Sequence, residues 1–225
     1  YAGCFIGAAL VQCLALPVLL GMPKLAVEIR EKQGRPISAF LRLPAFRLAL
    51  CSAALGYAVM SFLMTAVPLQ IVNVSLLGEA LNARVIQWHV IAMFAPSFFT
   101  GSLITRFGIR AIMTAGLVLY LAGIILALSG LQFWYYFATL FFVGLGWNFL
   151  YIAGTSLVTL VTEPEERGRV QGITDMTVFT AVACASLSAG IIHTIGGWHI
   201  MALAALLPIS IIGVTIAMTS KPSLP

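Results

Sequence analysis

The sequence predicts an all-α fold, a polytopic membrane bundle of seven transmembrane helices. Hydrophobic residues make up 61% of the 225 residues and charged residues only 8%, against roughly 25% charged in soluble domains. Sixty-one per cent of 225 is about 137 residues, and seven spans of about 20 residues need about 140. The long apolar runs lack the two-residue alternation of strands, which favours helices. The composition also leaves no room for a soluble catalytic domain of about 100 residues.

Seven apolar runs are long enough to cross a bilayer when the sequence is read with a window of about 19 residues. They are Ala2–Met22, Leu48–Val72, Val85–Thr105, Ala111–Ser129, Phe133–Leu160, Ile173–Ile195 and His199–Thr219. The chain opens at Tyr1 on an apolar run, with neither the basic segment nor the small-residue cleavage site of a signal peptide. We therefore expect the first run to be a span of a chain that is truncated at its N-terminus.

The connection after the first run, Gly21–Arg47, is the longest and the most basic, with six Lys or Arg residues and three prolines. These features are typical of a hinge between two units. The sequence therefore predicts the last helix of an N-terminal half at residues 1–22. A cytoplasmic central loop is expected at residues 23–47, followed by a six-helix C-terminal half at residues 48–225.

The later runs differ in polarity. The runs Ala111–Ser129 and His199–Thr219 have few polar side chains, which is typical of helices that face lipid. The third, fifth and sixth runs carry polar groups that are costly in hydrocarbon unless they face protein or water. These groups belong to Gln87, His89, Asn148, Asp175, Thr177 and Thr180. We expect these three helices to line a cavity.

The basic residues predict the orientation. Eleven of the twelve Lys and Arg residues lie in connections on one side of the predicted bundle or in the C-terminal tail, and only Arg84 lies on the other. Cytoplasmic loops carry the excess of Lys and Arg. We therefore expect the first residue outside the cell and the last residue in the cytoplasm.

Two cytoplasmic connections carry motifs. The first has Gly101, Arg106, Gly108 and Arg110, which resembles the loop motif of the major facilitator superfamily, with Thr105 where the family usually has an acid. Glycine permits a tight reversal, and arginine can bond carbonyl groups of a neighbouring helix end. The second motif is similar to the acid-Pro-x-x-Arg-Gly segment between helices ten and eleven of that family. Its residues here are Glu163, Arg167, Gly168 and Arg169. A solvated, charged turn is the other interpretation of this segment.

The resemblance covers the whole chain as helix six, the central loop and helices seven to twelve. It implies a secondary active transporter of the bacterial inner membrane that carries a small organic solute by alternating access. The expected partners are the solute, protons, the lipid bilayer and the missing N-terminal half of the same transporter. No cofactor, metal or nucleic acid is expected.

Six polar or aromatic residues are the candidates for contact with the solute, because they lie on helices that the resemblance places around the cavity. They are Tyr57, Ser61 and Thr65 in the second run, and Trp147, Asn148 and Tyr151 in the fifth. An amide among aromatic rings suits a flat organic ligand. A hydrogen bond from Asn148 to another helix is an equally good interpretation of that residue.

Two ionisable residues are candidates for proton coupling or gating. Asp175 is the only acid within a predicted span, and such a group is a functional hypothesis by default. The alternative is a structural role near a helix N-terminus, paired with Arg110 or Arg169. His89 lies near the outer end of its span, where a histidine titrates near neutral pH or anchors the helix at the interface.

Two other classes of protein are alternatives to a transporter. A membrane-embedded enzyme would use residues such as His89, Ser156 and Asp175, but their predicted depths differ too much for hydrogen-bond reach. The sequence also has neither HExxH nor GxSxG, the motifs of metalloproteases and of serine hydrolases. A structural membrane partner remains the other alternative to a transporter.

Overall fold

The computed structural model describes residues 2–21 and 34–219, and the chain divides into two units. The first unit, residues 1–33, contains helices α1 (Ala2–Cys13) and α2 (Ala15–Leu20). Most of the predicted hinge, residues 22–33, lies outside the described residues, as does the tail from residue 220. No strand occurs in the part of the chain that the structure describes, in agreement with the predicted all-α class.

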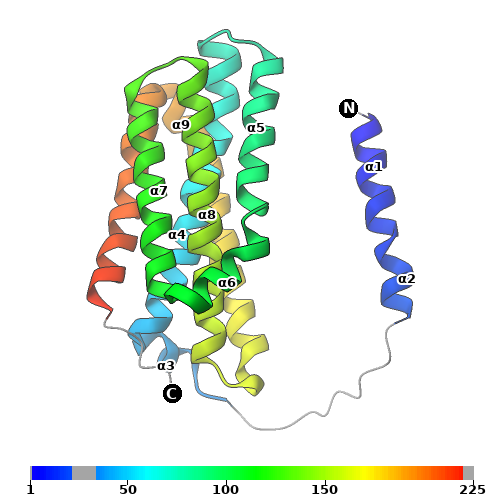
Figure 1. Ribbon diagram of the computed structural model, residues 1–225, viewed down its shortest axis with the longest axis vertical. Coiled ribbons are helices and arrows are strands. Elements are labelled where there is room, and N and C mark those ends of the chain that lie inside the picture. The colour runs from blue at the N-terminus through cyan, green and yellow to red at the C-terminus, as the bar shows by residue number, and fades with distance from the viewer. Residues whose placement is uncertain (1, 22–33, 220–225) are drawn as a thin grey trace. The chain divides into compact units, whose positions relative to one another are not determined.

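The second unit, residues 34–225, is a bundle of helices (Figure 1). Its elements are α3 (Ile37–Arg42), α4 (Pro44–Pro68), the π-helix η1 (Leu69–Val74), α5 (Glu79–Phe94), α6 (Ser97–Phe107), α7 (Ile109–Ser129), α8 (Phe133–Val161) and α9 (Pro164–Met218). Residues 34–47, which we predicted as part of the central loop, belong to this unit and include α3.

Four stretches of the described residues are long and apolar enough to cross a membrane, and a fifth results if α5 and α6, bent by 43°, count as one span. The four are Pro44–Val74, Ile109–Ser129, Phe133–Val161 and Pro164–Met218. This supports a polytopic membrane bundle, while the count of seven spans stays a prediction. Within the first predicted span, the apolar helical stretch Phe5–Pro17 is shorter than the length needed for a membrane span.

Helix α9 contains a reversal of the chain. Its 55 residues would extend about 80 Å as one straight helix, far more than the roughly 30 Å of a bilayer core. Gly197 has φ +66° and breaks the helix, at the turn that the sequence predicted for residues 196–198. Figure 1 shows one arm rising to this point and the other, coloured orange to red, descending from it.

Helix α8 lies at the centre of the bundle and approaches its neighbours through glycines. A Cβ atom added at Gly154 would lie 2.9 Å from the carbonyl oxygen of Ala49 in α4. At Gly146 it would lie 2.9 Å from the carbonyl oxygen of Gly116 in α7. Small residues at these crossings let the helix backbones pack closely. This close packing fixes the positions of the side chains where α8 meets α4.

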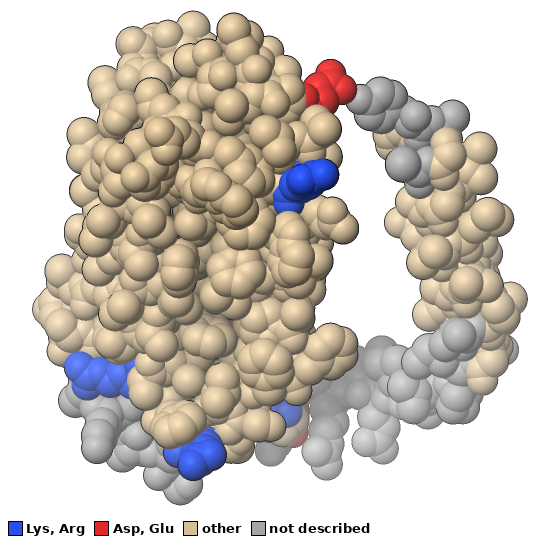
Figure 2. All heavy atoms as spheres, turned by 45° about the horizontal axis from the view of Figure 1, so that its top comes forward, with Lys and Arg blue, Asp and Glu red and all other residues tan. Residues whose placement is uncertain are grey.

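The surface of the bundle is largely uncharged. Figure 2 shows broad areas without Lys, Arg, Asp or Glu, and most of the Lys and Arg side chains in view lie near the lower edge. Large apolar side chains on the outside include Phe98, Leu187 and Ile195, each more than three-quarters exposed. Such a surface suits a lipid environment.

Candidate functional site

Three of the predicted contact residues form an aromatic cluster between α4 and α8. The rings of Trp147 and Tyr151 stack with their centroids 5.2 Å apart and their planes within 9°. The ring of Tyr57 meets both edge-on, at 5.1 Å from Trp147 and 5.4 Å from Tyr151. Tyr57 and Tyr151 are half-buried. The one-turn spacing of Trp147 and Tyr151 on α8 places their rings in register.

Two further aromatic residues extend this cluster. Phe94, the last residue of α5, meets Trp147 at 5.7 Å, and Phe179 of α9 lies 6.3 Å from Tyr57. Both phenylalanines are more than half exposed. The sequence analysis missed them because a phenylalanine in an apolar run carries no signal that separates a ligand contact from a lipid contact. Four helices therefore contribute rings to one partly open surface.

The cluster also holds an unused hydrogen-bond donor. The side chain of Trp147 is 5% exposed, and its indole Nε1–H has no acceptor among the described residues. Buried donors without a partner are rare in folded proteins. The aromatic surface therefore combines π-faces for a flat molecule with one N–H that has hydrogen-bonding capacity left.

The two hydroxyl candidates on α4 have different surroundings. The hydroxyl of Ser61 lies 2.7 Å from that of Ser186 on α9, so this serine joins two helices. Thr65 is exposed. Of the two, Thr65 has the side chain that is more open to a solute.

Asn148 is completely buried, and its amide bonds the bent pair α5 and α6. Its Nδ2 donates to the carbonyl oxygen of Met93 and to the hydroxyl of Ser97, both at 2.6 Å. Its Oδ1 accepts a 2.6 Å hydrogen bond from Thr100. These residues flank Pro96, which has no backbone N–H to continue the helix. The contacts are those of the second interpretation, a hydrogen-bonded link between helices.

The ionisable candidates lie at separate places. Asp175 is half-buried and accepts a 2.8 Å hydrogen bond from Gln171 on the preceding turn. The two arginines considered as its partners bond elsewhere. His89 is completely buried, and its Nδ1 donates to the carbonyl oxygen of Leu140 at 2.6 Å. Since none of its surface is exposed, an interfacial anchor is the wrong interpretation of this histidine.

The first loop motif forms the reversal between α6 and α7. Gly108 has φ +83°, a conformation that side chains other than glycine rarely adopt. Arg110 donates to the carbonyl oxygen of Ala217 near the end of α9, at 3.4 Å. The guanidinium of Arg106 lies over the Phe107 ring, and Gly101 is exposed. The expected contact between an arginine and a helix-end carbonyl is therefore present.

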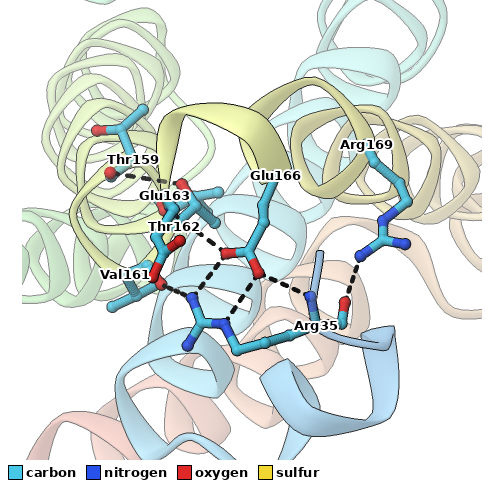
Figure 3. A network of polar contacts seen from close by, with 8 residues as sticks. Arg35, Thr159, Val161, Thr162, Glu163, Glu166 and Arg169 are labelled. Carbon is cyan, nitrogen blue, oxygen red and sulfur yellow. Dashed lines mark hydrogen bonds and ion pairs between the residues drawn. The ribbon is translucent and has the colours of Figure 1, made fainter. Parts of the chain in front are cut away.

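The second loop motif takes part in a network with the segment before α3 (Figure 3). Arg35 forms two hydrogen bonds with the carboxylate of Glu166, at 3.0 Å from Nε and 2.7 Å from Nη2. Nη2 also donates to the carbonyl oxygen of Val161, the last residue of α8. Arg35 therefore joins the end of α8 to the start of α9.

The backbone of Arg35 is held as well. Its N–H donates to Glu166 at 2.8 Å, and its carbonyl oxygen accepts from Arg169. Glu166 and Glu163 complete a reciprocal capping box at the start of α9. Arg167 and Gly168 are exposed. The solvated turn considered for this segment is thus only half correct, because Glu166 is buried and bonded while its neighbours face outward.

The pKa of Glu166 reflects this environment. Hydrogen bonds from Arg35 lower the pKa of this carboxyl to about 2, from an ordinary 4.5. A carboxylate whose pKa is lowered by folding stabilises the fold above its unfolded-state pKa, and this contribution is lost as the pH falls toward the folded-state pKa. The stabilising contribution of Glu166 is therefore lost as the pH falls from about 4.5 to about 2.

We expect Glu166→Gln to lower the melting temperature of the detergent-purified protein at pH 7, because the amide cannot accept two charge-assisted bonds. Between about pH 4.5 and pH 2 the difference from the wild type should shrink. Glu79→Gln, at an exposed glutamate on α5, is the control and should have a smaller effect. A Glu166→Gln variant as stable as the wild type at pH 7 would contradict this interpretation.

Comparison with known proteins decides the family. The model of the Major Facilitator Superfamily matches residues 48–224. The chain belongs to the major facilitator superfamily. The sequence resemblance is thereby confirmed, and this chain is a transporter-family protein of the membrane rather than an enzyme.

Three relatives of this superfamily chain are named as transporters, two of them as MFS-type transporters. It is 44% identical over 205 residues to the riboflavin transporter RfnT of Brucella anthropi, covering 88% of this chain and 51% of that protein. The uncharacterized MFS-type transporter YdeG of Bacillus subtilis is 36% identical over 48% of this chain and 26% of its own length. YddS of the same organism is 29% identical over 72% and 38%. The chain thus spans about half the length, or less, of these relatives.

Proposed function

We propose that this chain is part of a secondary active transporter for riboflavin or a closely related flat heterocycle. The observation that carries the proposal is the aromatic cluster of Tyr57, Trp147, Tyr151, Phe94 and Phe179, hereafter the aromatic cluster. The 44% identity to a protein named a riboflavin transporter supports the choice of solute.

The chemistry of riboflavin suits this surface. Its tricyclic ring is planar and aromatic, and ring carbonyls and nitrogens accept hydrogen bonds. Phe94 and Phe179 offer exposed faces on which such a ring can stack, and offset or edge-on aromatic contacts are favourable. The free Nε1–H of Trp147 can donate to an acceptor on the ring once the ligand moves the surrounding side chains.

The arrangement in the membrane is proposed as follows. Seven spans cross the bacterial inner membrane, with residue 1 outside and residue 225 in the cytoplasm. Residues 1–22 end an N-terminal half, residues 23–33 link the halves, and residues 34–225, which include α3, belong to the second half. The solute binds between this half and the missing one near the midplane, and rocking of the halves exposes it to each side in turn.

The proposal is tested by uptake of radiolabelled riboflavin in proteoliposomes that contain the full-length transporter. We expect saturable uptake that unlabelled riboflavin competes away and that ribose alone does not. Empty liposomes are the control. Absence of riboflavin uptake under either sign of pH gradient would reject the solute assignment.

Proton coupling is proposed through Asp175. This group is half-buried on α9, and Phe179 of the aromatic cluster follows it by one helical turn on the same helix. We expect Asp175→Asn to abolish the stimulation of uptake by a pH gradient while exchange without a gradient continues. Glu79→Gln, at an exposed glutamate on α5, is the control and should keep the stimulation. Unchanged gradient-driven uptake in Asp175→Asn would exclude Asp175 as the proton carrier.

A further inference from the structure

A second polar centre lies at the end of the bundle where η1 finishes. His193 of α9 bonds the Oε1 atom of Gln70 through its Nε2 at 2.9 Å. The Nε2 atom of Gln70 donates to the Tyr136 hydroxyl at 3.0 Å and to the Ser75 hydroxyl at 3.3 Å. The two hydroxyls lie 2.8 Å apart. These four side chains, hereafter the η1 network, join η1, α8 and α9.

The η1 network is separate from the aromatic cluster. Gln70 follows Tyr57 by 13 residues (70 − 57), or about 20 Å along a helix. Tyr136 is fully buried, Gln70 is 3% exposed and His193 is 9% exposed. Buried polar groups within a membrane bundle are costly unless they are bonded to one another, and they mark functional positions.

The backbone around this network is unusual. The η1 segment is a π-helix, a rare geometry that is frequent at functional sites. Two residues after its end, Leu76 has φ +52°, a strained conformation for a residue other than glycine. Strained backbone persists only where its surroundings hold it. Here the hydrogen bonds of Gln70 and Ser75 are among the contacts that hold it.

The hydrogen bonds of the network have two possible directions. When His193 carries a proton on Nε2, it donates to the Gln70 carbonyl oxygen, and the Gln70 amide nitrogen faces two hydroxyl acceptors. When Nε2 is unprotonated, rotation of the Gln70 amide by half a turn presents its nitrogen to His193 and its oxygen to the hydroxyls. In both directions Gln70 stays bonded to His193 and to a hydroxyl, so a neutral His193 is compatible with a closed network.

A doubly protonated His193 carries a positive charge that the network does not compensate. Tyr136 is the only other titratable side chain in the network, and no carboxylate or guanidinium from η1, α8 or α9 bonds to it within the described residues. His199, on the second arm of α9, is exposed. A buried imidazolium without a counter-charge is unfavourable. Protonation of His193 therefore favours an arrangement in which the ends of η1, α8 and α9 separate and water reaches the imidazole ring.

We propose that His193 is a proton-binding site that controls the end of the bundle where η1, α8 and α9 meet. Neutral His193 holds these three ends together through Gln70, and protonated His193 favours their separation. By linkage, opening of this end raises the affinity of His193 for a proton. The inference rests on the proposed transport function and deepens it, since it adds a second proton-binding residue, His193, at a place separate from Asp175.

The test measures opening of this end without any transported solute. Single cysteines replace Ile71, which is fully buried on η1, or Asn73, which is exposed on the same element, in a cysteine-free full-length transporter. Labelling by a membrane-impermeant maleimide is timed in proteoliposomes at pH 8 and pH 5. The ratio of the Ile71→Cys rate to the Asn73→Cys rate largely cancels the loss of thiolate at acid pH.

The rate ratio should rise about fivefold or more on acidification, the lower end of ordinary coupling between two sites. His193→Gln should abolish the rise, and the matched control His199→Gln should retain it. Gln70→Leu, which removes the partner of His193, should give a high ratio at both pH values. Because labelling needs no solute, this experiment can be interpreted even if riboflavin is not taken up. A wild-type ratio that does not change with pH, or a rise that survives in His193→Gln, would overturn the proposal.

Discussion

Replacing Trp147 with leucine should raise the half-saturation concentration for riboflavin about 5-fold to 150-fold. Stacking of an aromatic heterocycle on an aromatic side chain contributes roughly 1–3 kcal/mol, which corresponds to that range of affinity. Trp147 contacts three other rings of the aromatic cluster, so its loss also removes the support of Tyr57 and Phe94. The measurement is the concentration dependence of uptake in proteoliposomes.

The matched control for this variant is Trp134→Leu. Trp134 is 70% exposed and packs on Phe133 and Phe137, away from the aromatic cluster. This control tests whether loss of any tryptophan from α8 is sufficient to raise the half-saturation concentration. Equal half-saturation concentrations for Trp147→Leu and the wild type, at equal amounts of folded protein, would remove the aromatic cluster from the binding site.

Replacing Gly154 with alanine is expected to destabilise the bundle by about 1–3 kcal/mol. The new Cβ would lie 2.9 Å from the carbonyl oxygen of Ala49 and 3.1 Å from the amide nitrogen of Ala53, both in α4. Both contacts are with backbone, which moves only if α4 and α8 separate. Because these helices carry the aromatic cluster, transport should fall together with the melting temperature in detergent.

Gly190→Ala supplies the control for this substitution. Gly190 also lies within a helix, but a Cβ added there meets no atom within 4 Å. Alanine has the better helix propensity, so this variant should melt at the wild-type temperature or slightly above it. If Gly154→Ala melts as Gly190→Ala does, the crossing of α4 and α8 is looser than described here.

Local patterns predicted much of the fold. The predicted run Phe133–Leu160 differs from α8, Phe133–Val161, by one residue, and Ala111–Ser129 differs from α7 by two. Glycine at residues 108 and 130 marks these boundaries in the sequence. The reversal at Gly197 was also predictable, because two adjacent glycines interrupt an otherwise apolar stretch. Hydrophobicity and glycine are local signals, so a single sequence is enough to detect them.

Pairing between distant residues was not predictable. Arg35 and Glu166 are 131 residues apart, and nothing in either segment indicates the other. The η1 network was missed for the same reason, since Gln70 and His193 lie in different apolar runs. For the aromatic cluster, helical spacing identified Trp147 and Tyr151, but the contribution of Phe94 depends on where α5 ends. These features follow from the packing of helices and not from local patterns.

The hydrogen bonds around Arg35 also set the length of the tether between the two units. Arg35 is fixed to the second unit by its side chain and its backbone, so the connection from α2 runs from Gly21 to Gly34, 14 residues (34 − 21 + 1). Such a segment reaches at most about 50 Å, roughly half the reach of the 27 residues (47 − 21 + 1) of the predicted loop. Loss of the Arg35 contacts would therefore lengthen the part of the connection that is not bonded to the second unit.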